Sequence, residues 1–132
     1  MGENADIARR GLDVFVRQSF DEARRLCSDD VELWTLYDDA GAQPMFEGRQ
    51  GLKLWFERLE QLWAFVEVQK VEVEERDGGW VLMRVAARVR GRGSPNEFEP
   101  KIAVAIRVSE GEITKFGLFP DEANAVAMIA SG

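Results

Sequence analysis

The sequence contains no histidine and only one cysteine, Cys27, which excludes several common kinds of catalytic and metal site. Ser-His-Asp and Cys-His triads need an imidazole base, and histidine-ligated zinc needs an imidazole ligand. A single thiol can neither form an internal disulfide nor complete a cysteine-rich zinc or haem motif. We therefore expect no metal and no cofactor, and we expect Cys27 to be a small buried hydrophobic residue.

Positive charge is also scarce, with 17 Lys and Arg against 24 Asp and Glu and a formal net charge of −7. Nucleic acids and anionic membranes attract clustered positive charge, so we expect neither as a partner. The sequence has no apolar run long enough to span a bilayer and none near its start that is typical of a signal peptide. These features predict a cytoplasmic protein.

The 132 residues, 45% of them apolar, predict one domain over residues 1–132. Apolar residues at helical spacing predict a helix over 5–18, with Asn4 as its N-cap. A capping box at Ser19 and Glu22 predicts a short second helix ending near Cys27. A third helix is predicted by the helical spacing of Leu52, Trp55, Phe56, Leu59, Leu62 and Trp63.

Five segments have the composition of strands: 31–37, 66–75, 80–90, 97–108 and 112–119. Short turns join the last four, which predicts an antiparallel meander with one face covered by the helices. A short helix after Pro120 is expected to present Ala123, Val126, Ala127 and Ala130 to the core. The predicted class is α+β, in the order α-α-β-α-β-β-β-β followed by a C-terminal helix.

Three segments carry a resemblance to a known family. Residues 19–22 followed by Leu26 and Asp29-Asp30-Val31, residues 46–56 (FEGRQGLKLWF), and residues 109–127 (SEGEITKFGLFPDEANAVA) occur in that order. Together they resemble SnoaL-like proteins of the nuclear transport factor 2 superfamily, relatives of ketosteroid isomerases and polyketide cyclases. The resemblance implies a cystatin-like roll: a cone-shaped, curved antiparallel sheet with three helices of the N-terminal half on its concave face.

The resemblance also implies an apolar pocket inside the cone and a homodimer formed through the sheet. In the family register, alternate residues of the strands point inward. The residues expected to form the pocket are Leu12, Phe15, Thr35, Tyr37, Trp55, Leu59, Trp63, Met83, Val85, Ile102, Val104 and Ile106. The homodimer has a second indication, because Ala103 and Ala105 should leave the outer face flat and weakly charged.

Known catalytic residues of the family are not found at the matching positions. The base, the tyrosine donor and the protonated aspartate of ketosteroid isomerases fall at Thr35, Gly11 and Val104. The R-x-D motif of related epoxide hydrolases is replaced by Arg88-Val89-Arg90. The leading interpretation is therefore a domain that binds a small hydrophobic molecule.

Two alternatives remain open. One is an isomerase, cyclase or hydrolase with a rearranged site, using Tyr37 with Asp38 or Asp39 for acid–base chemistry. The other is a structural homodimer module whose cone is filled by side chains. Whether the protein is an enzyme is undecided at this point, with the missing family residues favouring binding alone.

Overall fold

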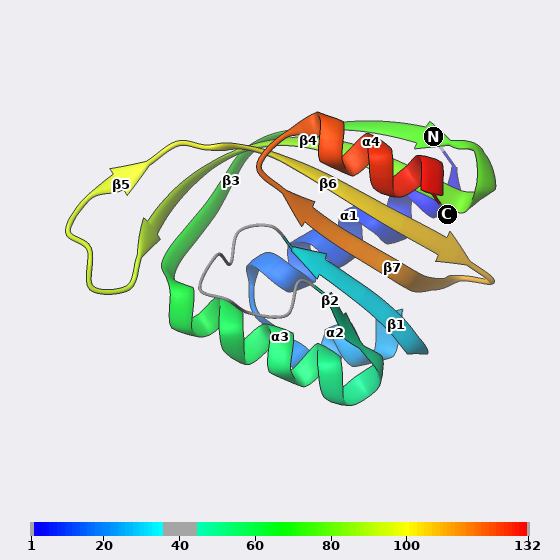
Figure 1. Ribbon diagram of the computed structural model, residues 1–132, viewed down its shortest axis with the longest axis horizontal. Helices are drawn as coiled ribbons and strands as arrows, with labels where there is room; N and C mark the ends of the chain where they lie inside the picture. Colours follow the sequence, from blue (N-terminus) through cyan, green and yellow to red (C-terminus); the bar gives the residue numbers. More distant parts are fainter. Residues whose placement is uncertain (1, 36–44, 132) are drawn as a thin grey trace.

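The computed structural model describes residues 2–35 and 45–131 and shows an α+β fold (Figure 1). The predicted order of helices and strands is confirmed, with two short strands added. The elements are α1 (Glu3–Val16), α2 (Phe20–Leu26), β1 (Cys27–Thr35), β2 (Met45–Glu47), α3 (Gly48–Leu62), β3 (Trp63–Arg76), the short 3-10 helix η1 (Asp77–Gly79), β4 (Trp80–Gly91), β5 (Glu97–Phe98), β6 (Lys101–Ser109), β7 (Glu112–Phe119) and α4 (Glu122–Ser131).

The strands form one sheet in the order β2-β1-β7-β6-β4-β3, with β5 paired to β4. The meander β3–β4–β6–β7 is antiparallel, as its short turns predicted. The sheet as a whole is mixed, because β1 runs parallel to β7. These two strands are separated by most of the chain, so no hairpin turn fixes their relative direction.

A bulge in β3 contributes to the curvature of the sheet. Val68 pairs with Ala87 and Lys70 pairs with Ala86, so Gln69 is an extra residue on β3. Such an insertion bends a strand and increases its twist. It also shifts the alternation of side chains, so the inward residues are Val66 and Val68 before the bulge but Val71 and Val73 after it.

The predicted N-cap of α1 is wrong, because the cap residue is Gly2 rather than Asn4. Ser19 is the N-cap residue of α2 as predicted, but its side chain makes no capping hydrogen bond, so the predicted capping box is not formed. The N–H of Ala5 in the first turn of α1 instead donates to Glu75 Oε1 on β3, at 3.2 Å. A carboxylate favours the positive end of a helix, so this long-range contact takes the place of a local cap.

The outer face of the sheet is covered by α4. Ala125 is buried there with Trp80, Leu82, Ala103, Ala105 and Phe119, in a cluster separate from the main core. Val126, Met128 and Ile129 pack against the same cluster, whereas Ala123, Ala127 and Ala130 are exposed. The predicted apolar face of this helix was therefore largely wrong. Residues 123–130 are nearly all apolar, so their pattern does not define one buried face.

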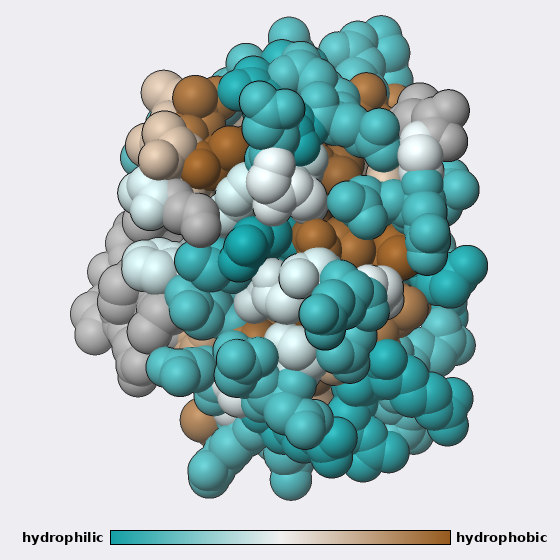
Figure 2. All heavy atoms as spheres, turned by 90° about the vertical axis from the view of Figure 1, so that its right-hand side faces the viewer, coloured by the Kyte–Doolittle hydropathy of each residue, from teal (hydrophilic) through white to brown (hydrophobic). Residues whose placement is uncertain are grey.

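The position of α4 changes the argument for a homodimer. Ala103 and Ala105 are only 4% and 0% exposed because α4 packs over them within the same chain. Their apolar character is thus explained without a second copy. The homodimer stays a prediction, and a dimer formed through this face would have to contact α4. Figure 2 shows the adjoining end of the molecule, on the right in Figure 1, where hydrophilic side chains cover most of the surface.

An ion-pair cluster fastens α4 to the sheet. Arg84 Nε on β4 donates to Glu122 Oε1 at 2.6 Å, and Arg84 Nη2 donates to Glu74 Oε1 at 3.2 Å. These hydrogen bonds favour the charged carboxylates and lower the pKa of Glu122 and of Glu74 below the ordinary 4.5. Glu74 and Arg84 are diagonal neighbours on β3 and β4, since Glu72 is directly opposite Arg84, and long side chains reach across such a diagonal.

We predict that Arg84→Met lowers the melting temperature at pH 7 and has a smaller effect at pH 3. A carboxyl group whose pKa is lower in the folded protein stabilises the fold at pH values above its ordinary pKa. This contribution is lost as the pH falls through the lowered pKa. Thermal unfolding between pH 7 and pH 3 measures the difference. Lys101→Met is the control, since Lys101 forms no ion pair with Glu74 or Glu122. An equal loss for Arg84→Met at both pH values would contradict the prediction.

Candidate ligand-binding cavity

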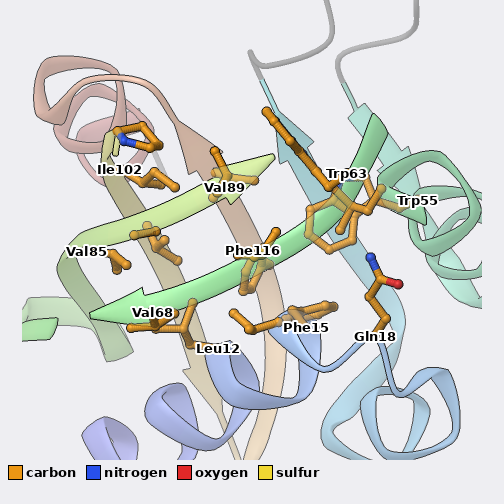
Figure 3. A pocket seen from close by; sticks show the side chains of 17 residues that line it. Leu12, Phe15, Gln18, Trp55, Trp63, Val68, Val85, Val89, Ile102 and Phe116 are labelled. Atoms are coloured by element: carbon orange, nitrogen blue, oxygen red, sulfur yellow. The ribbon is translucent and has the colours of Figure 1, made fainter. Parts of the chain in front are cut away.

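A cavity lies at one end of the curved sheet. Neighbouring antiparallel strands alternate in direction, so the start of β3, the end of β4, the start of β6 and the end of β7 meet there. Trp63, Val89, Ile102 and Leu118 come from these four positions, and α1 and α3 close the space on the concave side (Figure 3). β1 ends at the same place, because Thr35 pairs with Leu118.

The cavity has a volume of about 80 Å³ and an almost wholly apolar lining. Among the residues predicted for the pocket, those that line it are Leu12, Phe15, Trp55, Leu59, Trp63, Val85, Ile102 and Val104. Their role in binding a ligand stays a prediction. Tyr37 lies outside the described residues, as do the catalytic candidates Asp38 and Asp39, and Thr35 is described through its strand pairing.

Met83 and Ile106 were predicted to form the pocket but do not line the cavity. Both side chains are fully buried in the main core, nearer the opposite end of the sheet. There α1 lies directly on the strands at Gly11. A Cβ atom at Gly11 would lie 2.6 Å from Ile113 Cδ1 and 3.9 Å from Ile106 Cδ1. This close approach of α1 to Ile106 and Ile113 closes the interior there, so the cavity is limited to the other end.

Gly11 also bears on the comparison with ketosteroid isomerase. In the family register this position matches the tyrosine that donates a hydrogen bond to the reacting oxygen. A Cβ atom at Gly11 would collide with Ile113 Cδ1 unless the Ile113 side chain or the helix shifted. Val104, at the position of the protonated aspartate, does line the cavity but offers only methyl groups.

The structure adds residues that the sequence did not single out for the pocket. They are Val16, Gln18, Val66, Val68, Val89, Pro100, Phe116 and Leu118. Ala87 also lines the cavity, as the alternation that placed Val85 inward along β4 predicts, and the same alternation along β4 and β7 could have identified Val89 and Phe116. Gln18 gave no such signal: it follows α1, is exposed, and has a left-handed backbone with φ of 58°. A non-glycine residue in this region is uncommon and costs conformational energy.

The polar groups of the lining are few. None of the described lining residues is ionisable, and their polar side-chain groups are the Gln18 carboxamide and the indole N–H groups of Trp55 and Trp63. Trp55 is 1% exposed, and its Nε1 has no hydrogen-bond partner among the described residues. The described residues also contain no cluster of three or more acidic or cysteine side chains able to hold a metal ion.

Cys27, at the start of β1, is buried and does not line the cavity. Burial, with a smaller contribution from the nearby charge of Glu112, raises the pKa of its thiol to about 12. The thiol is therefore protonated at neutral pH and is a poor nucleophile.

We predict that native protein reacts slowly with Ellman's reagent at pH 8 and that protein unfolded in guanidinium chloride reacts with one equivalent. The raised pKa and the burial both disfavour the thiolate in the folded state, and unfolding removes both effects. Absorbance of the released thiolate measures the rate. Cys27→Ser gives the background, and rapid reaction of the native protein would show that the thiol is accessible.

Comparisons with known proteins agree with this architecture. A model of the SnoaL-like domain family matches residues 8–116. An NTF2-like protein of unknown function from Burkholderia pseudomallei has a TM-score of 0.77 at 17% identity, with 98% of each chain covered. A putative polyketide cyclase from Xanthomonas campestris has a TM-score of 0.71 at 15% identity, with 96% of each chain covered.

A phenazine biosynthesis-related protein from Pseudomonas aeruginosa is also similar, with a TM-score of 0.66 and 15% identity over 89% of this chain and 76% of that chain. No curated protein matches the sequence. The architecture is thus that of NTF2-like proteins. Within that class, the chain belongs to the SnoaL-like domain family. No helix in the described part of the chain is long and apolar enough to cross a membrane.

We predict that Val104→Asp destabilises the protein by about 3 kcal/mol at pH 8 and by less at pH 5. Val104 is fully buried in the apolar lining, so a carboxyl group there has a raised pKa. In the unfolded chain the introduced carboxyl group ionises with an ordinary pKa near 3.9. The loss of folding free energy therefore grows as the pH rises above that value. Thermal unfolding at both pH values measures it. Val104→Asn is the non-titrating control, and equal losses for Val104→Asp at pH 5 and pH 8 would refute the buried position.

Proposed function

We propose that this protein is a small-molecule-binding domain whose cavity holds a small apolar ligand. The observation that carries the proposal is the concave, apolar lining at the end of the sheet where α1 and α3 close the space. Ligand sites are typically concave and mostly apolar, with a few polar groups that orient the ligand. The described lining has this composition, with one carboxamide and two indoles among aliphatic and phenyl groups.

The volume of the cavity limits the size of the ligand. About 80 Å³ is small beside the roughly 300–1,000 Å³ of most ligand sites. A one-ring molecule therefore requires some outward movement of the wall. Burying roughly 150 Å² of apolar surface at about 25 cal/mol per Å² gives about 4 kcal/mol. This corresponds to a dissociation constant on the order of 1 mM.

The names of two proteins with similar structures support the proposal. One is called a putative polyketide cyclase and another a phenazine biosynthesis-related protein, and both names refer to small-molecule chemistry. At 15% identity the likeness concerns the fold, so the ligand of this chain has to be argued from its own cavity. An apolar wall recognises a ligand mainly through shape and buried area.

We predict that toluene shifts the methyl NMR signals of residues around the cavity and that Ala87→Ile weakens this binding at least tenfold. Ala87 lines the cavity and is 1% exposed, so the added methyl groups occupy space needed by the ligand. Ala86→Ile is the matched control, because Ala86 is the next residue on β4 and faces the other side of the sheet. Unchanged toluene binding by Ala87→Ile, or no binding by the wild type, would contradict the proposal.

The enzyme alternative depends on residues that follow β1. β1 ends beside the cavity, where Thr35 pairs with Leu118, and Tyr37, Asp38 and Asp39 follow Leu36 in the chain. A catalytic role for these residues stays a prediction. The described lining itself offers no ionisable group for acid–base chemistry.

A further inference from the structure

A half-exposed aromatic ring, that of Phe98 on β5, lies next to the cavity. β5 belongs to the arm of residues 92–100 between β4 and β6, which projects at the left of Figure 1. Phe98 pairs with Val89 on β4, and side chains of directly paired residues lie on the same face of a sheet. Val89 is buried in the cavity wall, so the Phe98 ring also lies on the concave face.

The neighbours of this ring are residues of the cavity wall. The Phe98 ring contacts that of Trp63 at a centroid distance of 5.9 Å, and Val89 is its strand partner. Pro100 follows two residues later, and its carbonyl oxygen accepts a hydrogen bond from the N–H of Ala87 at 3.2 Å. Trp63, Val89 and Pro100 all line the cavity. Phe98 therefore continues the apolar wall outward.

The arm is held in place by contacts with α3 and β4. The Arg92 N–H donates to the carbonyl oxygen of Leu62 at 3.0 Å, and Arg92 Nε donates to the carbonyl oxygen of Glu60. On the other face of the arm, Glu97 Oε1 lies 3.6 Å from Arg88 Nε. These contacts fix the arm beside the C-terminal end of α3, so the aromatic ring has a defined position at the edge of the cavity.

The exposed area of the ring indicates the size of its partner. Phe98 is 49% exposed, and a phenyl ring at this exposure presents on the order of 100 Å² of apolar surface. A stable protein interface buries roughly 800 Å² on each partner, so this ring is far too small to form one by itself. Its area instead matches one flat group of a small molecule.

The cavity indicates where the rest of such a molecule lies. Because the cavity measures only about 80 Å³, most of a larger ligand has to lie outside it. Trp63 and Pro100 are only partly buried, so the wall borders solvent on the side of Phe98. The described lining has no ionisable group, so a charged end inside would be desolvated without a counter-charge. A longer neutral ligand can place one apolar end inside and a second flat group against Phe98.

We propose that Phe98 and Trp63 form a second binding subsite at the edge of the cavity, and that the protein selects elongated, neutral molecules with two flat apolar parts. The inference rests on the proposed function, since one of the two parts enters the cavity. It adds a subsite and specifies the length and charge of the ligand. The first part is bound by enclosure, and the second packs on the Phe98 ring in the offset or edge-on geometry that aromatic pairs prefer.

N-Benzylacetamide and N-benzylbenzamide test the subsite as a matched pair. Both carry the same benzyl group for the cavity, but a methyl group in the first is a phenyl ring in the second. NMR titration gives the dissociation constants of both with the wild type, Phe98→Ser and Leu54→Ser. Leu54→Ser is the matched control, because Leu54 is also 49% exposed but lies on α3 and does not line the cavity.

We expect the wild type and Leu54→Ser to bind N-benzylbenzamide roughly tenfold more tightly than N-benzylacetamide, the effect of burying about 60 Å² more apolar surface. Phe98→Ser should reduce this preference roughly threefold or more, because it removes the ring that covers this surface. A preference that is absent from the wild type, or unchanged by Phe98→Ser, refutes the subsite while the binding function stands. If neither molecule binds the wild type, the proposed function itself fails.

The NMR signals of the Phe98 ring give a second measurement in the wild type. In protein with isotope-labelled phenylalanine, these signals are assigned by their loss in Phe98→Ser. They should shift with N-benzylbenzamide and much less with N-benzylacetamide, and the benzoyl ring should show NOE contacts to them. Equal shifts with both molecules would overturn the inference. So would shifts that depend on protein concentration without ligand, because they would assign the ring to a contact with a second copy of the chain.

Discussion

The ring of Phe15 contacts Phe116 at a centroid distance of 4.1 Å, Trp55 at 5.0 Å and Phe56 at 5.1 Å. These contacts join α1, α3 and β7, which are distant in the sequence, and they hold both helices against the sheet. Aromatic pairs with such offset and edge-on geometry are favourable beyond the area they bury. Phe15, Trp55 and Phe116 also line the cavity. The same contacts therefore fix the fold and shape the candidate site.

The cavity results from a change of residue size along one face of α1. Gly11 and Phe15 are four residues apart, so they lie on the same face of the helix. At Gly11 the helix lies against Ile113, and one turn later the Phe15 ring occupies the space between helix and sheet. A small residue followed by a large one gives a wedge-shaped interior. The wide part of this wedge contains the cavity, and the narrow part contains Ile106 and Ile113.

The sequence predicted the features that depend on local pattern. Periodicity identified the helices and the meander, and alternation along β6 placed Val104 inside and Ala105 outside, as the two separate core clusters confirm. The features it missed depend on distant contacts. The extra residue Gln69 is defined by pairing with β4, the first turn of α1 is capped by Glu75 seventy residues away, and the buried face of α4 is chosen by the sheet. The missing hydrogen-bond partner of Trp55 Nε1 likewise depends on residues distant in the sequence, whereas the place of Trp55 in the cavity wall was predicted.

The bulge in β3 has a consequence for how this protein behaves in solution. β3 is the last strand of the described sheet, and an uncovered outer strand can recruit a strand from another molecule. The extra residue at Gln69 breaks the regular spacing of backbone donors and acceptors that such recruitment needs. Glu67, Lys70 and Glu72 also place charged, exposed side chains along this strand. The irregularity that helps to curve the sheet thus also protects its border from open-ended strand addition and aggregation.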